Sequence, residues 1–316
     1  MNYLIADIGG TNARFAIFNG EKLSREKTLS TADYESLLAA IAAYLDGVGK
    51  EVNAGCLAVA CPINDDQVSF TNNPWSFSIS KLKGGLGFAE LHVINDFEAM
   101  ARSLSFLEEK DLFLLGPKLP KTKETMAILG PGTGLGMAAL RPYKGEYVPL
   151  ATEGGHARFA PSDSRQQDLV GVLSEKLGFV CNEDLLSGYG LVNIYRGLCS
   201  LDKKPSTLQD PAGVCEAALT GTDSAAQEAL DMFWSILGAI AGDYALQTGA
   251  LGGVYIAGGI TPRYLDSVKK SSFRENFESK GSYRKYMEKI PTYVVTAEQP
   301  GLLGAAALFI KAGDGQ

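Results

Sequence analysis

The feature that most constrains the fold is a strand-turn-strand pattern near the start of the chain, which recurs further along. In the first copy, from Ile5 to Phe18, two apolar runs of strand length flank the polar segment Gly9-Gly10-Thr11-Asn12. Glycines can adopt positive φ without steric cost, so this segment predicts a β-hairpin with a tight turn. Backbone N–H groups of such a turn converge on one concavity that suits phosphate oxygens, and Arg14 adds a cationic donor.

The second copy, from Ile128 to Leu140, has Gly132-Thr133 where the first has Gly10-Thr11. Neither copy is a P-loop or a dinucleotide fingerprint, since no Gly-Lys-Ser/Thr follows and each turn leads into a strand rather than a helix. The first copy alone is equally compatible with an ordinary hairpin that carries Asp7 at its rim. Its repetition favours two turns that bind one polyphosphate from opposite sides, with Asp7 facing a metal ion on those phosphates.

Length and charge narrow the class of protein. The 316 residues suffice for two domains, and the polar stretch from Ser105 to Lys123 marks the passage between them. A net charge of -7 argues against a nucleic-acid partner. Five cysteines without a C-x-x-C pair indicate neither a disulfide framework nor a zinc site. With no leader pattern and no apolar run of membrane-spanning length, we expect a cytoplasmic protein that does not bind membranes.

Four further segments lie where ligands often bind, and three of them carry polar side chains. Asn95-Asp96 follows a predicted strand and precedes a helix, a position favoured by catalytic carboxylates, although an Asp96 that merely caps the helix is the simpler interpretation. Glu153-Gly-Gly-His156 lacks the spacing of a metal site but can aim both side chains at one small ligand. Glu183 is either a ligand or an acid at a helix start. Gly258-Gly259 allows a flat ring to approach, or only a tight turn.

Apolar periodicity predicts the remaining elements. We expect Ser271 to Lys289 to be surface, and a helix from Gly301 to Ala312 to pack on the first domain. A capping box of Ser224 and Gln227 would begin the longest helix. The predicted helices are 34–46, 79–86, 165–176, 191–199 and 225–248, and the predicted strands are 23–29, 54–61, 67–70, 91–94, 146–151, 251–257 and 292–295.

In combination, these motifs resemble those of the bacterial glucokinases of the hexokinase superfamily, which shares its duplicated phosphate-binding turn with actin and the heat-shock chaperone ATPases. The resemblance runs in order over nearly the whole chain. A cysteine-rich zinc motif found in related repressors and kinases is replaced here by Phe159-Ala-Pro-Ser-Asp163, which favours the zinc-free glucokinase branch. The matching segments are Ala6 to Arg14, Thr71-Asn72 with Trp75, Ile94 to Phe97, Gly130 to Gly136, Glu153 to His156, Glu183 with Leu186-Ser-Gly188, and Ala257 to Ile260.

The resemblance implies a two-domain α/β fold of the ribonuclease H-like, actin/hexokinase type, with a cleft between the domains. A small domain would comprise residues 1–105, completed by a C-terminal helix at 299–316, and a large domain residues 106–298. The implied reaction is transfer of the γ-phosphate of ATP to the 6-hydroxyl of glucose, giving glucose 6-phosphate and ADP as the first step of glycolysis. Mg²⁺ and a homodimer are also implied.

The resemblance assigns roles residue by residue. Asp96 would be the general base on the 6-hydroxyl, and Asp7 would face the metal ion. The hexose would be bound by Asn95, Asp96, Glu153, His156 and Glu183. The nucleotide would be bound by Ala6, Asp7, Ile8, Gly9, Gly10, Thr11, Asn12, Arg14, Gly132, Thr133, Gly134, Gly258 and Gly259. Three alternatives stay open: another hexose kinase of the superfamily, an actin-like or chaperone-like ATPase, and a sugar sensor without catalytic activity.

Overall fold

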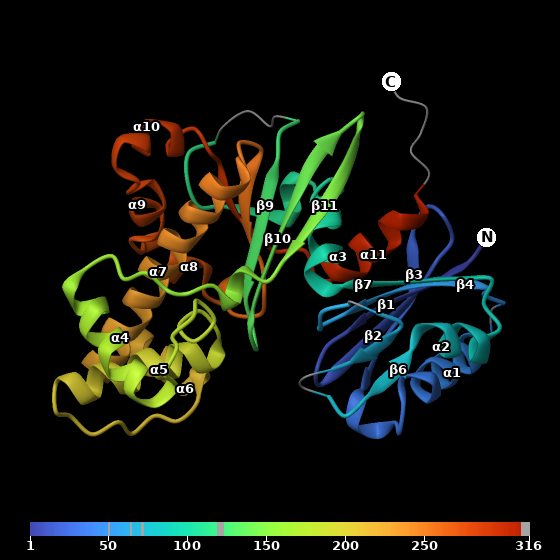
Figure 1. Ribbon diagram of the computed structural model, residues 1–316, viewed down its shortest axis with the longest axis horizontal. Coiled ribbons are helices and arrows are strands. Elements are labelled where there is room, and N and C mark those ends of the chain that lie inside the picture. The colour runs from blue at the N-terminus through green and yellow to red at the C-terminus, as the bar shows by residue number, and fades with distance from the viewer. Residues whose placement is uncertain (50, 64, 71–72, 119–122, 311–316) are drawn as a thin grey trace. The chain divides into compact units, whose positions relative to one another are not determined.

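The computed structural model describes residues 1–49, 51–63, 65–70, 73–118 and 123–310, which form two compact units (Figure 1). Unit 1 consists of Met1–Leu107, Pro142–Ala151 and the chain from Ala297 onward, and unit 2 of Glu108–Arg141 and Thr152–Thr296. The segment Pro142–Ala151, which the sequence placed in the large domain, therefore groups with unit 1. The motif pair Thr71-Asn72 lies outside the described residues.

The sheet of unit 1 has five strands in the order β3-β2-β1-β4-β7. β1 pairs antiparallel with β2 and parallel with β4, which is parallel to β7. β4 is buried throughout, in keeping with its run of small and apolar residues. The parallel register places Ile8, Val59 and Asn95 side by side, so the segments that follow them share one edge. The bounds are β1 Tyr3–Ile8, β2 Asn12–Phe18, β3 Leu23–Ser30, β4 Ala54–Val59 and β7 Glu90–Asn95.

Helices cover both faces of this sheet, and the C-terminal helix α11 belongs to one of these layers. Leu302 and Ala305 of α11 join Ile5 and Ala16 in a buried cluster. Gly304 allows the close approach of α3, because a β-carbon there would overlap the carbonyl of Ala99. The helix ends at Ala306 rather than at Ala312 as predicted. The remaining bounds are α1 Leu37–Val48, α2 Ile79–Leu86, α3 Asp96–Ser103, α11 Pro300–Ala306 and the short strands β5 Gln67–Ser69 and β6 Ser76–Ser78.

The second sheet has six strands in the order β11-β10-β9-β12-β13-β8. β9 and β10 form the second antiparallel hairpin, and β9, β12 and β13 are parallel. Leu129 and Ile256 are therefore neighbours near the same edge of the sheet. The bounds are β8 Leu112–Leu114, β9 Met126–Pro131, β10 Leu135–Tyr143, β11 Glu146–Thr152, β12 Gly253–Ile256 and β13 Thr292–Val295.

The 25-residue helix α7 is the centre of the core of unit 2, and two predictions about its surroundings are wrong. Its N-cap is Asp223, whose carboxylate accepts hydrogen bonds from Ala225 N and Ala226 N, so Ser224 forms no capping box. The segment expected at the surface contributes the buried residues Phe273, Phe277 and Met287. The bounds are α4 Ser164–Leu177, α5 Gly188–Leu201, α6 Pro211–Thr220, α7 Ser224–Thr248, α8 Leu265–Lys270, α9 Phe273–Glu278 and α10 Arg284–Met287.

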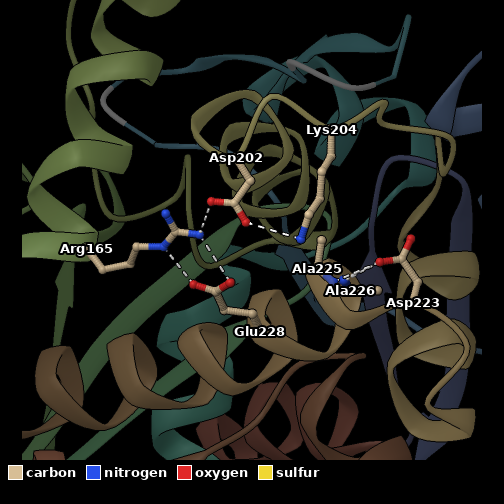
Figure 2. A network of polar contacts seen from close by, with 7 residues as sticks. All are labelled: Arg165, Asp202, Lys204, Asp223, Ala225, Ala226 and Glu228. Atoms are coloured by element: carbon tan, nitrogen blue, oxygen red, sulfur yellow. Dashed lines mark hydrogen bonds and ion pairs between the residues drawn. The ribbon is translucent and has the colours of Figure 1, made fainter.

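A network of ion pairs ties α4 to α7 and to the end of α5 (Figure 2). Arg165 donates from Nε to Glu228 Oε1 at 2.7 Å and from Nη2 to Asp202 Oδ1 at 2.9 Å. The guanidinium holds the pKa of Asp202 below its usual range. These contacts support the helical half of unit 2. In the part of the chain that the structure describes, no helix is both long and apolar enough to cross a membrane.

Candidate active site

The first turn, Gly9 to Asn12, is closed by a hydrogen bond from Gly9 N to Asn12 O at 2.9 Å. Gly9 does not adopt positive φ, so the predicted reason for its glycine is wrong. The turn is instead anchored by Thr31, which was not identified from the sequence. Thr31 Oγ1 donates to Gly10 O at 2.9 Å and Thr31 N donates to Thr11 O at 3.0 Å. Thr31 is only 4% exposed, so this anchor is shielded from competing water.

Asp7 and Arg14 face one another across the first hairpin. Arg14 Nη1 lies 3.2 Å from Asp7 Oδ2, and their side chains are 42% and 21% exposed. Burial raises the pKa of Asp7 despite the opposing effect of the guanidinium. At the start of α11, Gly301 leaves room for this carboxylate, since a β-carbon there would lie 3.0 Å from Asp7 Oδ2. The sheet edge thus carries one confined carboxylate beside the first turn.

The surroundings of Asp7 fit a magnesium ion that is held mainly by its substrate. Among the described residues, no group of three or more His, Cys, Asp or Glu side chains can form a metal cage of protein ligands. Mg²⁺ commonly keeps several waters and binds one or two carboxylates together with substrate phosphates. A single carboxylate, Asp7, next to the turn that the sequence predicts to bind phosphate fits that pattern.

Asn95 and Asp96 begin α3 with different roles. Asn95 is the N-cap, because its Oδ1 accepts from Phe97 N at 2.9 Å and from Glu98 N at 3.2 Å. The simpler interpretation, in which Asp96 caps the helix, is therefore wrong: Asp96 is the first helical residue, and its Oδ1 accepts from Phe97 N at 2.9 Å. The β7 register places both residues at the sheet edge that bears the first turn.

The second turn, Gly132 to Gly134, packs more tightly than the first. Gly132 N donates to Gly134 O at 2.8 Å, and Gly188 N at the start of α5 donates to Gly132 O at 2.8 Å. Leu135 N, the first amide after the turn, donates to Glu183 Oε2 at 2.7 Å. A β-carbon on Gly134 would overlap that carboxylate oxygen. Gly134 is therefore required by the close approach of Glu183, not by positive φ.

Gly258 and Gly259, which were assigned to the nucleotide from the sequence, lie against the end of β9 and the second turn. Gly258 has φ of 83°, and a β-carbon there would overlap Pro131 O. Ile260 N donates to the same carbonyl at 3.3 Å. A β-carbon on Gly132 would lie 3.8 Å from Gly259 N. Gly258 is thus needed by the strand-to-helix turn itself, whereas a β-carbon on Gly259 would have no atom within 4 Å. Both residues bring the backbone close to the predicted phosphate site.

The segment Glu153 to His156 meets the second turn from another side. Asn182 Nδ2 donates to Gly154 O at 3.0 Å, and Glu183 N donates to Gly155 O at 2.9 Å. A β-carbon on Gly155 would overlap Leu135 O. The structure therefore packs the backbone of the segment Glu153–His156 against Glu183 and against Leu135, which follows the second turn. Asn182 was missed from the sequence, although its position directly before Glu183 was a signal.

The predicted site residues thus fall into two sets, each assembled within its own unit. Unit 1 contributes the first turn, the pair Asp7–Arg14 and the carboxylate of Asp96. Unit 2 contains the second turn, Gly258-Gly259, Glu183 and the segment Glu153–His156, here called the acid-histidine segment. Backbone N–H groups, a cation and carboxylates are the groups that phosphoryl transfer to an alcohol uses.

Known proteins resemble this chain over nearly its whole length. The family model named Glucokinase matches residues 4–312. A curated glucokinase of Erwinia tasmaniensis is 44% identical over 306 residues, which cover 96% of this chain and 95% of that protein. The crystal structure of a glucokinase from an Antarctic psychrotroph has a TM-score of 0.88 and 35% identity, and 98% of each chain is covered.

A more distant structure, a glucokinase of the ROK family from Streptomyces griseus in complex with glucose and AMPPNP, has a TM-score of 0.63 at 18% identity. It covers 98% of this chain and 99% of that one, and at this identity it bears on the fold alone. The fold is that of the actin/hexokinase-type sugar kinases, as predicted. Both the family model and the identity to curated glucokinases extend over the described turns, and the chain belongs to the glucokinase family.

Proposed function

We propose that this chain is a cytoplasmic glucokinase, which transfers the γ-phosphate of ATP to the 6-hydroxyl of glucose and releases glucose 6-phosphate and ADP. It would serve as the first step of glycolysis. The observation that carries the proposal is the position of Glu183 in a chain of this family: its carboxylate accepts from Leu135 N beside the second turn, and its own N donates to Gly155 O of the segment Glu153–His156. Glu183 thereby joins the second turn to the segment that carries Glu153 and His156.

The nucleotide is bound by the two turns. The first turn and Arg14 donate to phosphate oxygens from unit 1, and the second turn and Gly258-Gly259 contribute backbone from unit 2. Asp7 would hold Mg²⁺, which would supply positive charge against the charge that develops on the transferred phosphoryl group. The glycines keep side chains away, so the backbone donors stay fixed and need no reorganisation during the reaction.

The sugar is bound by Asn95 and Asp96 from unit 1 and by Glu153, His156 and Glu183 from unit 2. Asp96 accepts the proton of the 6-hydroxyl as its oxygen attacks phosphorus, a role that contributes about 10²- to 10⁴-fold in rate. Asn95 rather than Asp96 is the N-cap of α3, and Asp96 Oδ1 accepts from Phe97 N. Several polar groups around one sugar also favour specificity, since a competitor without one hydroxyl leaves its partner unpaired.

Two alternatives differ from this proposal in measurable ways. Another hexose kinase of the superfamily would phosphorylate mannose, fructose or glucosamine better than glucose. A sensor without catalytic activity would bind sugar but produce no ADP. We propose a homodimer as the assembly, by likeness to the family.

A coupled assay across a panel of sugars and phosphoryl donors tests the function. We expect glucose with ATP and Mg²⁺ to give the highest kcat/KM, and removal of Mg²⁺ by a chelator to abolish turnover. A higher kcat/KM with another hexose would reassign the substrate. Sugar binding without ADP formation would indicate the sensor.

A further inference from the structure

Glu183 makes contacts that a sugar ligand alone does not need. Its Oε2 accepts a hydrogen bond from Leu135 N at 2.7 Å, and Leu135 is the first residue after the second turn. A bond from an amide to a carboxylate is charge-assisted and stronger than one between neutral groups. One of the two carboxylate oxygens is thereby committed to the phosphate-binding turn, and Oε1 is the oxygen left for a sugar hydroxyl.

The backbone of the same residue is tied to the acid-histidine segment. Glu183 N donates to Gly155 O at 2.9 Å, and its neighbour Asn182 donates from Nδ2 to Gly154 O and from N to Ala157 O, both at 3.0 Å. On the other side, Gly155 packs directly on Leu135 O. Leu135 is therefore bound through its amide by Glu183 and contacted at its carbonyl by Gly155.

We propose that Glu183 is a positioning residue that couples the phosphate-binding second turn to the sugar-binding segment. The proposal rests on the proposed function, because it assigns phosphate to the second turn and sugar to Glu153 and His156. Any displacement of the second turn moves Leu135 N, and Glu183 moves with it or loses the bond. Nucleotide binding at the turn and sugar binding at Glu183 are thus coupled through one carboxylate. Each ligand then changes the affinity of the chain for the other by the same factor.

Two alanine substitutions in the second turn isolate this link. In Gly134→Ala, the β-carbon overlaps Glu183 Oε2 and displaces the carboxylate. In the matched control Gly132→Ala, the nearest atoms to the β-carbon are Gly259 N at 3.8 Å and Gly134 O at 4.0 Å, so Glu183 is untouched. Neither glycine has positive φ, so backbone strain does not separate the two variants.

Glucose affinity without nucleotide is the readout, measured by calorimetry on the full chain. We expect Gly134→Ala to weaken glucose binding by at least about tenfold, since displacement of Glu183 costs the sugar a charged partner. Gly132→Ala should bind glucose within about twofold of the unsubstituted protein, whatever its affinity for ATP. Equal glucose affinity in both variants would overturn the coupling, whereas absence of glucose binding in the unsubstituted protein would overturn the proposed function instead.

A second comparison does not depend on Gly134→Ala folding. Glu183→Ala removes the acceptor of Leu135 N, so it should raise the KM for ATP as well as the KM for glucose. Glu153→Ala is the comparison, because it also removes an acid, but one with no described hydrogen bond to the second turn. It should raise the KM for glucose and leave the KM for ATP unchanged. If Glu183→Ala leaves the KM for ATP unchanged, Glu183 is only a sugar ligand and the proposal is wrong.

Discussion

The first and second turns share one sequence plan but are supported by different neighbours. The first turn is anchored by the hydroxyl and amide of Thr31 and is flanked by the Asp7–Arg14 ion pair. The second turn is bound by the carboxylate of Glu183 and the amide of Gly188, and glycines pack closely around it. Sequence similarity between the turns thus preserves the backbone donors and not the means by which they are held in place.

The two turns also differ in the charged groups that lie beside them. The first turn presents charge, in Asp7 and Arg14, and shares its sheet edge with Asp96. The second turn presents closely packed backbone, and its charged neighbour Glu183 is already hydrogen-bonded to it. We therefore expect substitutions near the first turn to act mainly on catalysis, and those around the second turn to act on packing and on sugar affinity.

The largest expected effect is on kcat and concerns Asp96, near the first turn. Asp96→Asn keeps the shape of the side chain but removes the proposed base, so kcat should fall by about 10²- to 10⁴-fold. Nucleotide affinity and thermal stability should change little. Glu98→Gln is the matched control on α3, because Glu98 pairs with Arg102 rather than facing substrate, and it should keep kcat within about threefold. Near-normal turnover of Asp96→Asn would remove Asp96 from the base role.

The next prediction compares packing at the two turns. In Gly155→Ala, the β-carbon meets the backbone of Leu135, which cannot move without the second turn, so the free energy of unfolding should fall by about 3 kcal/mol. In Gly9→Ala, the nearest atom is Asn12 O at 3.6 Å, an ordinary contact, and the loss should stay below about 1 kcal/mol. Denaturant unfolding of both variants gives the comparison, and equal losses would contradict the difference in packing.

A smaller effect is expected from the anchor of the first turn. Thr31→Val keeps the shape of the side chain but removes the bond to Gly10 O, which should cost about 1 kcal/mol and raise the KM for ATP by about fivefold. Thr31→Ser retains a hydroxyl and should restore most of the ATP affinity. If the valine variant destabilises the protein without changing the KM for ATP, Thr31 supports the fold and not the turn.

The smallest effect concerns the cost of confining Asp7. Burial raises the pKa of Asp7 above 3.8, so the folded state binds its proton more tightly than the unfolded state does. This tighter proton binding stabilises the folded state fully at a pH below the usual pKa of an aspartate. The stabilisation is lost as the pH rises through the raised pKa of Asp7. Asp7→Asn should raise the Tm of the nucleotide-free protein at neutral pH by about 2 °C while lowering activity. A lower Tm at neutral pH would contradict this sign.

Local sequence patterns predicted the bounds of some helices and strands correctly. The helix at Ile79–Leu86 and the strand at Thr292–Val295 have the predicted bounds. The start of α7 was misplaced because Asp223 and Ser224 are both good N-caps, and propensity alone does not choose between neighbours. Phe273 and Phe277 were hidden in a charged stretch, although their spacing of four is that of a helix face.

The candidate site shows a different limit. The sequence predicted Asp96, Glu183 and the glycine turns as site residues, but it did not predict why residue 134 is a glycine. Its requirement comes from Glu183, which lies far along the chain, and that contact exists only after the chain has folded. Thr31 and Asn182 were not identified from the sequence for the same reason. Each donates a hydrogen bond to a backbone carbonyl, a group that every residue has, so no sequence pattern marks the contact.

The most direct test of the central claim is a crystal structure of the chain with glucose, Mg²⁺ and a non-hydrolysable ATP analogue. We expect both turns to contact the same polyphosphate, and a carboxylate oxygen of Asp96 to lie about 3 Å from the 6-oxygen of glucose. A nucleotide bound by only one of the two turns, or an Asp96 carboxylate out of hydrogen-bond reach of that oxygen, would contradict it.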